Sequence, residues 1–212
     1  MSGEEQRDEP QIRIAGICGS LRPGSYTRLA LSKALEGASE LGAQTQLIDL
    51  RDYDLVLSNG STEAAHYPPG VLRLREDVKH ADGIILATPE YHGGLSGVLK
   101  NALDLMGFDE FEGKMIGLVG VSGGRMGAMD ALNSLRNIGR ALHAWVIPEQ
   151  ASVPEAWKVF DERGELKDPA VANRLREVGH QVARFARLHK CEQALDFLKN
   201  WEKAADNPGG KQ

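Results

Sequence analysis

The chain has 212 residues, of which 42% are hydrophobic and 26% charged, and its formal net charge is −5. This length suits a single α/β domain, and the composition excludes a disordered, collagen-like or coiled-coil protein. The acidic balance argues against a general nucleic-acid-binding protein, and no apolar run is long enough for a membrane span. The 24 glycines indicate tight turns and loops that approach a ligand closely.

The negative charge is concentrated at the amino end, where the first ten residues carry four carboxylates and one arginine. We expect residues 1–10 to be a disordered acidic tail. This end also lacks the basic-then-apolar pattern of a signal peptide. Cys18 and Cys191 lie far apart, without Cys or His at metal-ligand spacing beside either. The sequence therefore predicts a cytoplasmic protein with reduced thiols and no metal.

Short apolar runs alternate with amphipathic segments along the rest of the chain. Such runs, each followed by helical periodicity, are typical of a parallel sheet covered by helices on both faces. The expected strands are 12–18, 44–50, 83–88, 115–121 and 142–147. The expected helices are 25–41, 71–80, 97–106, 126–140 and about 169–201, and the loop 51–69 is long enough to flank an active site. This order suits a flavodoxin-like and a Rossmann-like winding equally well.

The loop after the first expected strand leads into the amino terminus of a helix. Such termini bind anions because their backbone N–H groups and the helix dipole face the ligand. Ser20, Ser25 and Thr27 add hydroxyl groups, and Arg22 adds a planar cation that suits phosphate oxygens. The dinucleotide G-x-G-x-x-G and the Lys-Ser/Thr of a nucleotide P-loop are both absent here. The whole cluster favours a phosphate site, although Ser25 alone is equally well explained as a helix cap.

The loop after the third expected strand, residues 88–97, indicates a flat ligand that lies against backbone. Its adjacent glycines let amide groups reach polar ring edges, and Tyr91 offers a stacking surface. Glu90 is also consistent with a surface charge or a helix-capping carboxylate, and His92 with a structural histidine. Lys100 and Asp104, four residues apart, are expected to pair on a helix surface.

The loop after the fourth expected strand, residues 120–127, is again rich in glycine. Ser122 is placed to donate a hydrogen bond to a ring carbonyl, and Arg125 to attract a second phosphate. A flexible loop with a solvated arginine is an equally good interpretation of this segment alone.

Together these loops resemble the signatures of the NADPH-dependent FMN reductase family. The first motif is Gly19-Ser20-Leu21-Arg22 with Ser25 beyond it, and the second is Thr88-Pro89-Glu90-Tyr91 with Leu99-Lys100-Asn101-Ala102-Leu103-Asp104. Ser122-Gly123-Gly124 stands where that family has a third loop beside the flavin. The resemblance covers about residues 11–190 and leaves 191–212 as a C-terminal helical extension and tail. It implies a flavodoxin-like three-layer α/β sandwich with a five-stranded parallel sheet in the order 2-1-3-4-5.

The resemblance also implies bound FMN and assigns the residues around it. The residues on the phosphate side would be Ser20, Arg22, Ser25, Tyr26 and Thr27. The residues along the isoalloxazine ring would be Pro89, Glu90, Tyr91, His92 and Gly93, with Ser122, Gly123 and Gly124 at its other end. Arg125 would be a candidate contact for NADPH.

The implied activity is FMN-dependent NAD(P)H oxidoreduction. Hydride would pass from NADPH or NADH to flavin N5, and then to a small-molecule acceptor such as a quinone, free flavin, metal ion or azo compound. The cofactor carries this chemistry, so no catalytic side chain is expected. Members are usually homodimers or homotetramers.

Two positions depart from the family pattern. Many members have Asn where this chain has His92, and Ser-Phe/Tyr-Asn is common where this chain has Tyr26-Thr27. His92-Gly93 is more similar to the branch with arsenic-resistance flavoproteins and quinone or chromate reductases. A flavodoxin-like electron carrier or redox sensor without nucleotide turnover is the alternative, against which Arg22 and the nearly neutral body of the chain argue. A hydrolase-type enzyme is a third possibility, disfavoured because no Ser-His-Asp set is visible in the sequence.

Overall fold

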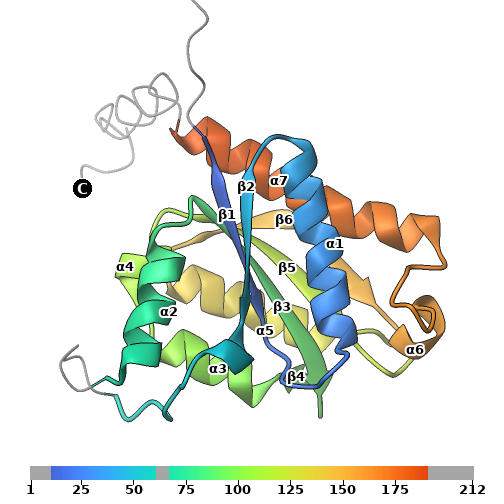
Figure 1. Ribbon diagram of the computed structural model, residues 1–212, viewed down its shortest axis with the longest axis horizontal. Helices are drawn as coiled ribbons and strands as arrows, with labels where there is room; N and C mark the ends of the chain where they lie inside the picture. Colours follow the sequence, from blue (N-terminus) through green and yellow to red (C-terminus); the bar gives the residue numbers. More distant parts are fainter. Residues whose placement is uncertain (1–10, 61–66, 191–212) are drawn as a thin grey trace, which may run out of the picture.

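Five parallel strands form the central sheet, in the spatial order β2-β1-β3-β5-β6 (Figure 1). The computed structural model describes residues 11–60 and 67–190, so the expectations for 1–10 and 191–212 lie outside the described residues. The strands are β1 (Arg13–Cys18), β2 (Gln44–Asp49), β3 (Gly83–Tyr91), β5 (Met115–Val121) and β6 (Trp145–Val153). This is the predicted order 2-1-3-4-5, which confirms the flavodoxin-like winding. A two-residue sixth strand, β4 (Gly94–Leu95), pairs antiparallel with β3 and was not predicted.

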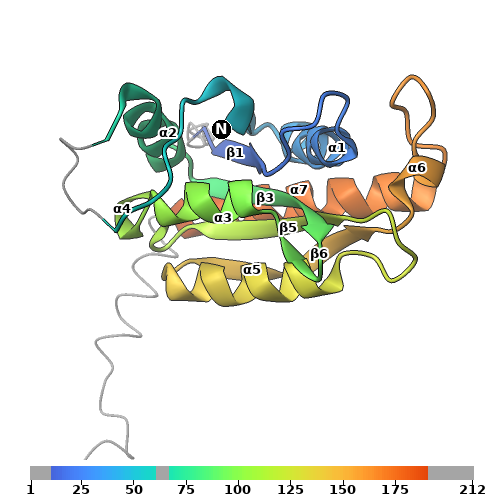
Figure 2. The same ribbon diagram turned by 90° about the horizontal axis from the view of Figure 1, so that it is seen from below.

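Helices cover both faces of the sheet (Figure 2). The main helices are α1 (Tyr26–Glu40), α2 (Pro69–Lys79), α3 (Gly97–Asp104), α5 (Met129–Ala141) and α7 (Pro169–Lys190). The short ones are the 3-10 turn η1 (Leu50–Asp52), α4 (Phe108–Phe111) and α6 (Ala156–Val159). The short helices were not predicted because three or four residues are too few to show a helical period.

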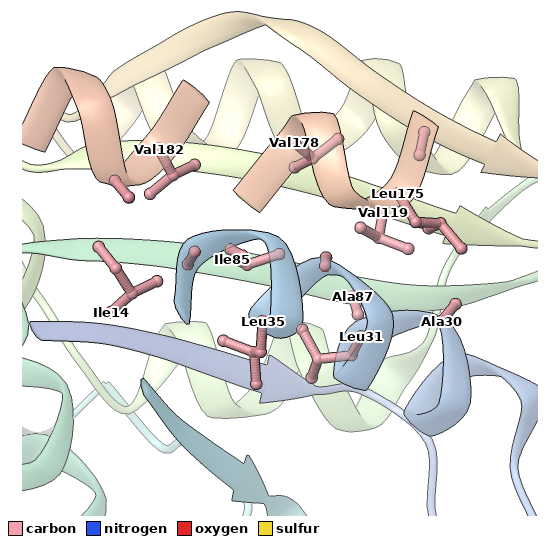
Figure 3. Packing of buried hydrophobic residues seen from close by; sticks show 14 of the residues in the cluster. Ile14, Ala30, Leu31, Leu35, Ile85, Ala87, Val119, Leu175, Val178 and Val182 are labelled. Atoms are coloured by element: carbon pink, nitrogen blue, oxygen red, sulfur yellow. The ribbon is translucent and has the colours of Figure 1, made fainter. Parts of the chain in front are cut away.

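Alternate residues of each strand face opposite helical layers, which produces two cores. Figure 3 shows one core, where Ile14, Ile85 and Val119 of the sheet meet α1 and α7. The neighbouring Ile84 and Leu86 point to the other face. There they pack with buried residues of α2, α3 and α5: Leu74, Val78, Leu99, Leu103, Leu132 and Leu135. Each fully buried aliphatic side chain contributes about 1.5–3 kcal/mol to folding.

The helices α1 and α7 cross in direct backbone contact at two glycines. A Cβ atom built on Gly37 would lie 2.2 Å from the carbonyl oxygen of Arg176, and one on Gly179 would lie 1.9 Å from that of Ala34. No side chain fits at either position. This contact fixes α1, whose amino terminus reaches the carboxyl edge of the sheet.

The sequence prediction was wrong about the bounds of two strands: β3 was expected to end at Thr88 and continues to Tyr91, and the last strand is displaced. Residues 142–147 were expected, but β6 begins at Trp145 and runs to Val153. Leu142 ends α5, and His143 follows in the left-handed region at φ 58°, so extended backbone begins only beyond it. The strand continues through Pro148 because β6 is an edge strand, where a missing N–H is tolerated. The helix expected from residue 126 begins instead at Met129, after Gly127 at φ 73°.

Candidate functional site

The three glycine-bearing loops converge at the carboxyl edge of the sheet, where ligands bind in open α/β sheets. They line a cavity of about 380 Å³. Ten of the predicted site residues form its wall: Ser20, Arg22, Ser25, Tyr26, Thr27, Pro89, Glu90, Tyr91, Ser122 and Gly123. The other predicted residues, His92, Gly93, Gly124 and Arg125, do not line it.

Hydroxyl groups surround the amino terminus of α1. Ser20, Ser25 and Thr27 are all buried, with at most 7% of each residue exposed. Ser25 occupies the N-cap position, but its hydroxyl makes no capping hydrogen bond. The first turn of α1 also contains no acidic residue. The helix end therefore keeps its positive potential and an uncommitted hydroxyl, which suits an anion.

Arg22 extends from the first loop across to the second. Its guanidinium carbon lies 5.9 Å from the centroid of the Tyr91 ring, within cation–π range. Its backbone N–H also donates to the Ser20 hydroxyl over 3.4 Å. Tyr91 itself is 43% exposed, so one part of its ring holds the cation while another remains accessible.

A buried polar network, which was not predicted from the sequence, joins these two loops. The Ser96 hydroxyl donates to the carbonyl oxygen of Gly19 over 2.6 Å and accepts from the N–H of Leu99, which makes it the N-cap of α3. The Thr88 hydroxyl accepts from the N–H of Ser96 over 3.0 Å. The N–H of Gly19 donates to Ala87. Each group is partnered, so the network locks the first loop onto the end of β3.

Glu90 caps a neighbouring helix. Its carboxylate accepts a hydrogen bond from the N–H of Ala131, in the first turn of α5, over 3.0 Å. The capping alternative noted for Glu90 is thus the contact observed. A carboxylate at this end of a helix is favourable because it faces the positive pole of the helix dipole.

His92 and Gly93 form the two-residue turn between β3 and β4. Their φ angles are 52° and 73°, both in the left-handed region. A two-residue hairpin turn of this kind requires positive φ at both positions, which Asn and Gly meet best and His tolerates. The backbone therefore accounts for the residue type at 92. The expected Lys100–Asp104 pair is confirmed at 2.7 Å.

A fourth wall, which the sequence did not predict, comes from the segment between β6 and α7. Ala156 and Trp157 of α6 line the cavity. The Phe160 ring stacks on Tyr26 with centroids 5.3 Å apart, which joins this segment to the start of α1. The N–H of Ala156 donates to the carbonyl oxygen of Ser122 over 3.0 Å and joins it to the loop after β5.

Cys18 lies directly behind the first loop and is fully buried. Burial raises the pKa of its thiol, so the side chain stays protonated and is no nucleophile. Among residues 11–60 and 67–190, no group of three or more His, Cys, Asp or Glu side chains could hold a metal ion. No helix in this part of the chain is long and apolar enough to cross a membrane.

The winding and this site define a flavodoxin-like protein. Solved structures support the fold. FerB, a flavoenzyme NAD(P)H:(acceptor) oxidoreductase from Paracoccus denitrificans, matches with a TM-score of 0.65 at 26% identity over 84% of this chain and 98% of its own. An archaeal flavodoxin matches in fold alone, with a TM-score of 0.57 at 12% identity over 84% of this chain and 99% of its own.

Sequence comparison is more specific. The model of the family described as NADPH-dependent FMN reductase matches residues 12–158. The chain is 32% identical to the NADPH-dependent FMN reductase ArsH of Shigella flexneri, over 85% of this chain and 71% of that protein. It is 37% identical to the NAD(P)H-dependent FMN reductase PA1204 of Pseudomonas aeruginosa, over 74% and 85%. The FMN-dependent NADPH-azoreductase of Staphylococcus saprophyticus is also 37% identical, over 69% and 79%.

The chain therefore belongs to the NADPH-dependent FMN reductase family. It is an oxidoreductase whose cofactor is FMN and whose co-substrate is NAD(P)H. The resemblance stated from the two loop motifs is confirmed.

Proposed function

We propose that the cavity at the carboxyl edge binds FMN and that the enzyme reduces small-molecule acceptors such as quinones and azo compounds. The single observation that carries the proposal is the cavity itself, whose wall holds ten of the predicted cofactor residues from three separate loops. Relatives that are named azoreductase and quinone reductase support this class of acceptor.

The residues present fit FMN. The uncommitted Ser25 hydroxyl and the acid-free first turn of α1 suit its phosphate. Gly24 and Gly123 line the cavity, and a Cβ atom at either would meet nothing within 4 Å, so the space beside them is left to a ligand. On this proposal Ser20, Arg22 and Thr27 also hold the phosphate, while Pro89 and Tyr91 flank the ring opposite Ser122.

When bound, FMN supplies the hydride-accepting and hydride-donating centre. The chain's own residues bind and orient it. Backbone N–H groups of the glycine-bearing loops would donate to polar ring edges, where such donors stabilise negative charge. The exposed parts of Tyr91 and Trp157 leave an open side for NAD(P)H and then for the acceptor. Burial raises the pKa of the Cys18 thiol, so this side chain stays protonated and does not act as a nucleophile.

The test is oxidation of NADPH or NADH by the FMN-loaded protein with a quinone, an azo dye or ferricyanide as acceptor. We expect oxidation well above the rate in buffer with at least one acceptor. Bound flavin without such oxidation would instead support the electron carrier or redox sensor. An acceptor series with both nucleotides then ranks the substrates.

We further propose that the protein is a homodimer or homotetramer and works in the cytoplasm. Exposed apolar side chains next to the loop after β5 support assembly: Met126 is 89% exposed and Met129 46%. Phe185 and Leu188 of α7 are also exposed, whereas the apolar residues expected beyond 190 lie outside the described residues. The free thiol of Cys18 suits a reducing compartment. Light scattering that gives the 23.1 kDa of one chain would refute the oligomer.

A further inference from the structure

Three charged side chains from two separate segments, the loop after β5 and the start of α6, meet beside the cavity. Glu155, which precedes α6, places its carboxylate 2.7 Å from the Lys158 ammonium and 3.7 Å from the Arg125 guanidinium. Arg125 belongs to the loop after β5, and Lys158 to α6. One carboxylate is thus shared by two cations, and the group carries a net positive charge.

The backbone fixes Glu155 at this place. Its φ of 43° and ψ of 47° lie in the left-handed region, which is uncommon for a residue other than glycine. Its N–H donates to the carbonyl oxygen of Gly124 over 3.1 Å. The position of the carboxylate is therefore tied to the same loop that presents Arg125.

The charged group adjoins the outside of the cavity wall. Trp157 lines the cavity, and the Lys158 ammonium lies 4.9 Å from the centroid of its ring. The side chains differ in exposure: Arg125 is 85% exposed, Lys158 47% and Glu155 27%. The two cations thus reach solvent, while the carboxylate between them is partly sheltered.

We propose that Glu155 determines how tightly the nicotinamide co-substrate binds, by competing with a phosphate group of that co-substrate for Arg125 and Lys158. This inference rests on the proposed function. A phosphate that approached the two cations would meet a position already held by a carboxylate of the same sign. The carboxylate keeps the co-substrate from binding too tightly, so that its oxidised form leaves and the acceptor can enter the same open side.

The test compares Michaelis constants of FMN-loaded variants at low ionic strength. Glu155→Gln keeps the size of the side chain and one acceptor oxygen but removes its charge. We expect it to lower the KM for the nucleotide about two- to fivefold, the range of exposed charge pairs. Lys158→Ala is expected to raise this KM by a similar factor. Both effects should shrink at about 0.5 M salt, because salt screens exposed charges.

The helix α1 provides a matched control. Glu36 lies 2.7 Å from Lys33 at the same three-residue spacing, and 4.0 Å from the guanidinium of Arg176. None of these three residues lines the cavity. Glu36→Gln and Lys33→Ala therefore remove similar charges elsewhere. They should leave the KM for NADPH and the KM for NADH unchanged.

Comparison of NADPH with NADH identifies the phosphate. An effect on NADPH alone assigns the 2′-phosphate, and an effect on both assigns the diphosphate; either supports the proposal. If Glu155→Gln behaves like Glu36→Gln, or if only the Kd for FMN changes, the proposal is overturned. If the unmodified enzyme oxidises NAD(P)H but Glu155→Gln leaves the KM for the nucleotide unchanged, this inference alone is contradicted. If the unmodified enzyme does not oxidise NAD(P)H, the proposed function is contradicted.

Discussion

The carboxylate of Glu90, at the end of β3, accepts a hydrogen bond from the backbone N–H of Ala131 in the first turn of α5 over 3.0 Å. This contact joins the end of β3 to α5, the helix that follows the loop after β5. The N-cap residue of α5 is Ala128, whose side chain makes no capping hydrogen bond. Glu90 of β3 therefore supplies the cap that the helix lacks.

Glu90→Ala should destabilise the protein by about 1–2 kcal/mol, because it removes both the acceptor and the negative charge at the helix end. Glu90→Gln keeps an acceptor and should cost less. Thermal unfolding of the two variants without cofactor measures the difference. Equal melting temperatures for Glu90→Ala and the unmodified protein would show that the cap contributes nothing.

Arg22→Ala should weaken FMN binding by about 1.5–3 kcal/mol, which is the size of a lost hydrogen bond to a charged group. The expected cause is loss of the phosphate contact together with the Tyr91 interaction. Flavin fluorescence after dialysis measures retention. Arg174→Ala, which removes an exposed arginine of α7, is the control and should retain FMN like the unmodified protein. Full retention by Arg22→Ala would exclude this arginine as the anchor.

Gly19→Ala should damage the site from within. A Cβ at Gly19 would lie 2.8 Å from the Cβ of Leu99 and 2.9 Å from the carbonyl oxygen of Ala87, and neither can move freely. We expect lower thermal stability and weaker FMN binding, because the first loop must shift off the end of β3. Gly97→Ala is the matched control: its Cβ meets nothing within 4 Å, and it stands at the start of α3. Alanine there should leave stability unchanged or raise it slightly.

Local sequence signals predicted the sheet and three walls of the cavity. Strands such as β5, with seven buried residues, and the glycine-bearing loops after them have signatures within a few consecutive residues. The fourth wall has none, because α6 is four residues long and is held beside the cavity by distant partners, through the Phe160–Tyr26 stack and the hydrogen bond from Ala156 to Ser122.

The same limit applies to the hydrogen bonds that hold the loops. The hydroxyl of Ser96 caps α3 and also donates to Gly19, 77 residues away. Glu90 contacts Ala131, 41 residues away. Such partners are decided by tertiary packing and not by spacing. The β6 bounds were missed for a related reason: the left-handed backbone of His143 depends on the end of α5.

His92→Asn should preserve or slightly raise stability, since Asn adopts positive φ in hairpin turns more readily than His. His92→Val should cost about 1–3 kcal/mol because a β-branched residue is strained there. FMN affinity should change little in His92→Asn, as this residue does not line the cavity. Urea unfolding measures the stability of the two variants, and flavin titration measures their FMN affinity. A His92→Val variant as stable as the unmodified protein would contradict the expected strain at this position.

The carboxylate of Asp49, at the end of β2, is 4% exposed and accepts from Arg51 over 2.9 Å and from Arg28 over 3.1 Å. The Arg51 hydrogen bond in particular lowers the pKa of Asp49 below its ordinary value. A carboxyl whose pKa is lower in the folded than in the unfolded state stabilises the fold fully above its unfolded pKa, near 4, and loses this contribution as the pH falls through the folded pKa.

Asp49→Asn should therefore melt well below the unmodified protein above about pH 5, with the gap closing as the pH falls through the lowered pKa of the folded state. Melting temperatures across this range measure the gap. Asp109→Asn, at an exposed aspartate, controls for the general effect of removing one negative charge. A gap that stays constant with pH would mean that packing of Asp49, and not its ionised form beside two arginines, supports the carboxyl edge of the sheet.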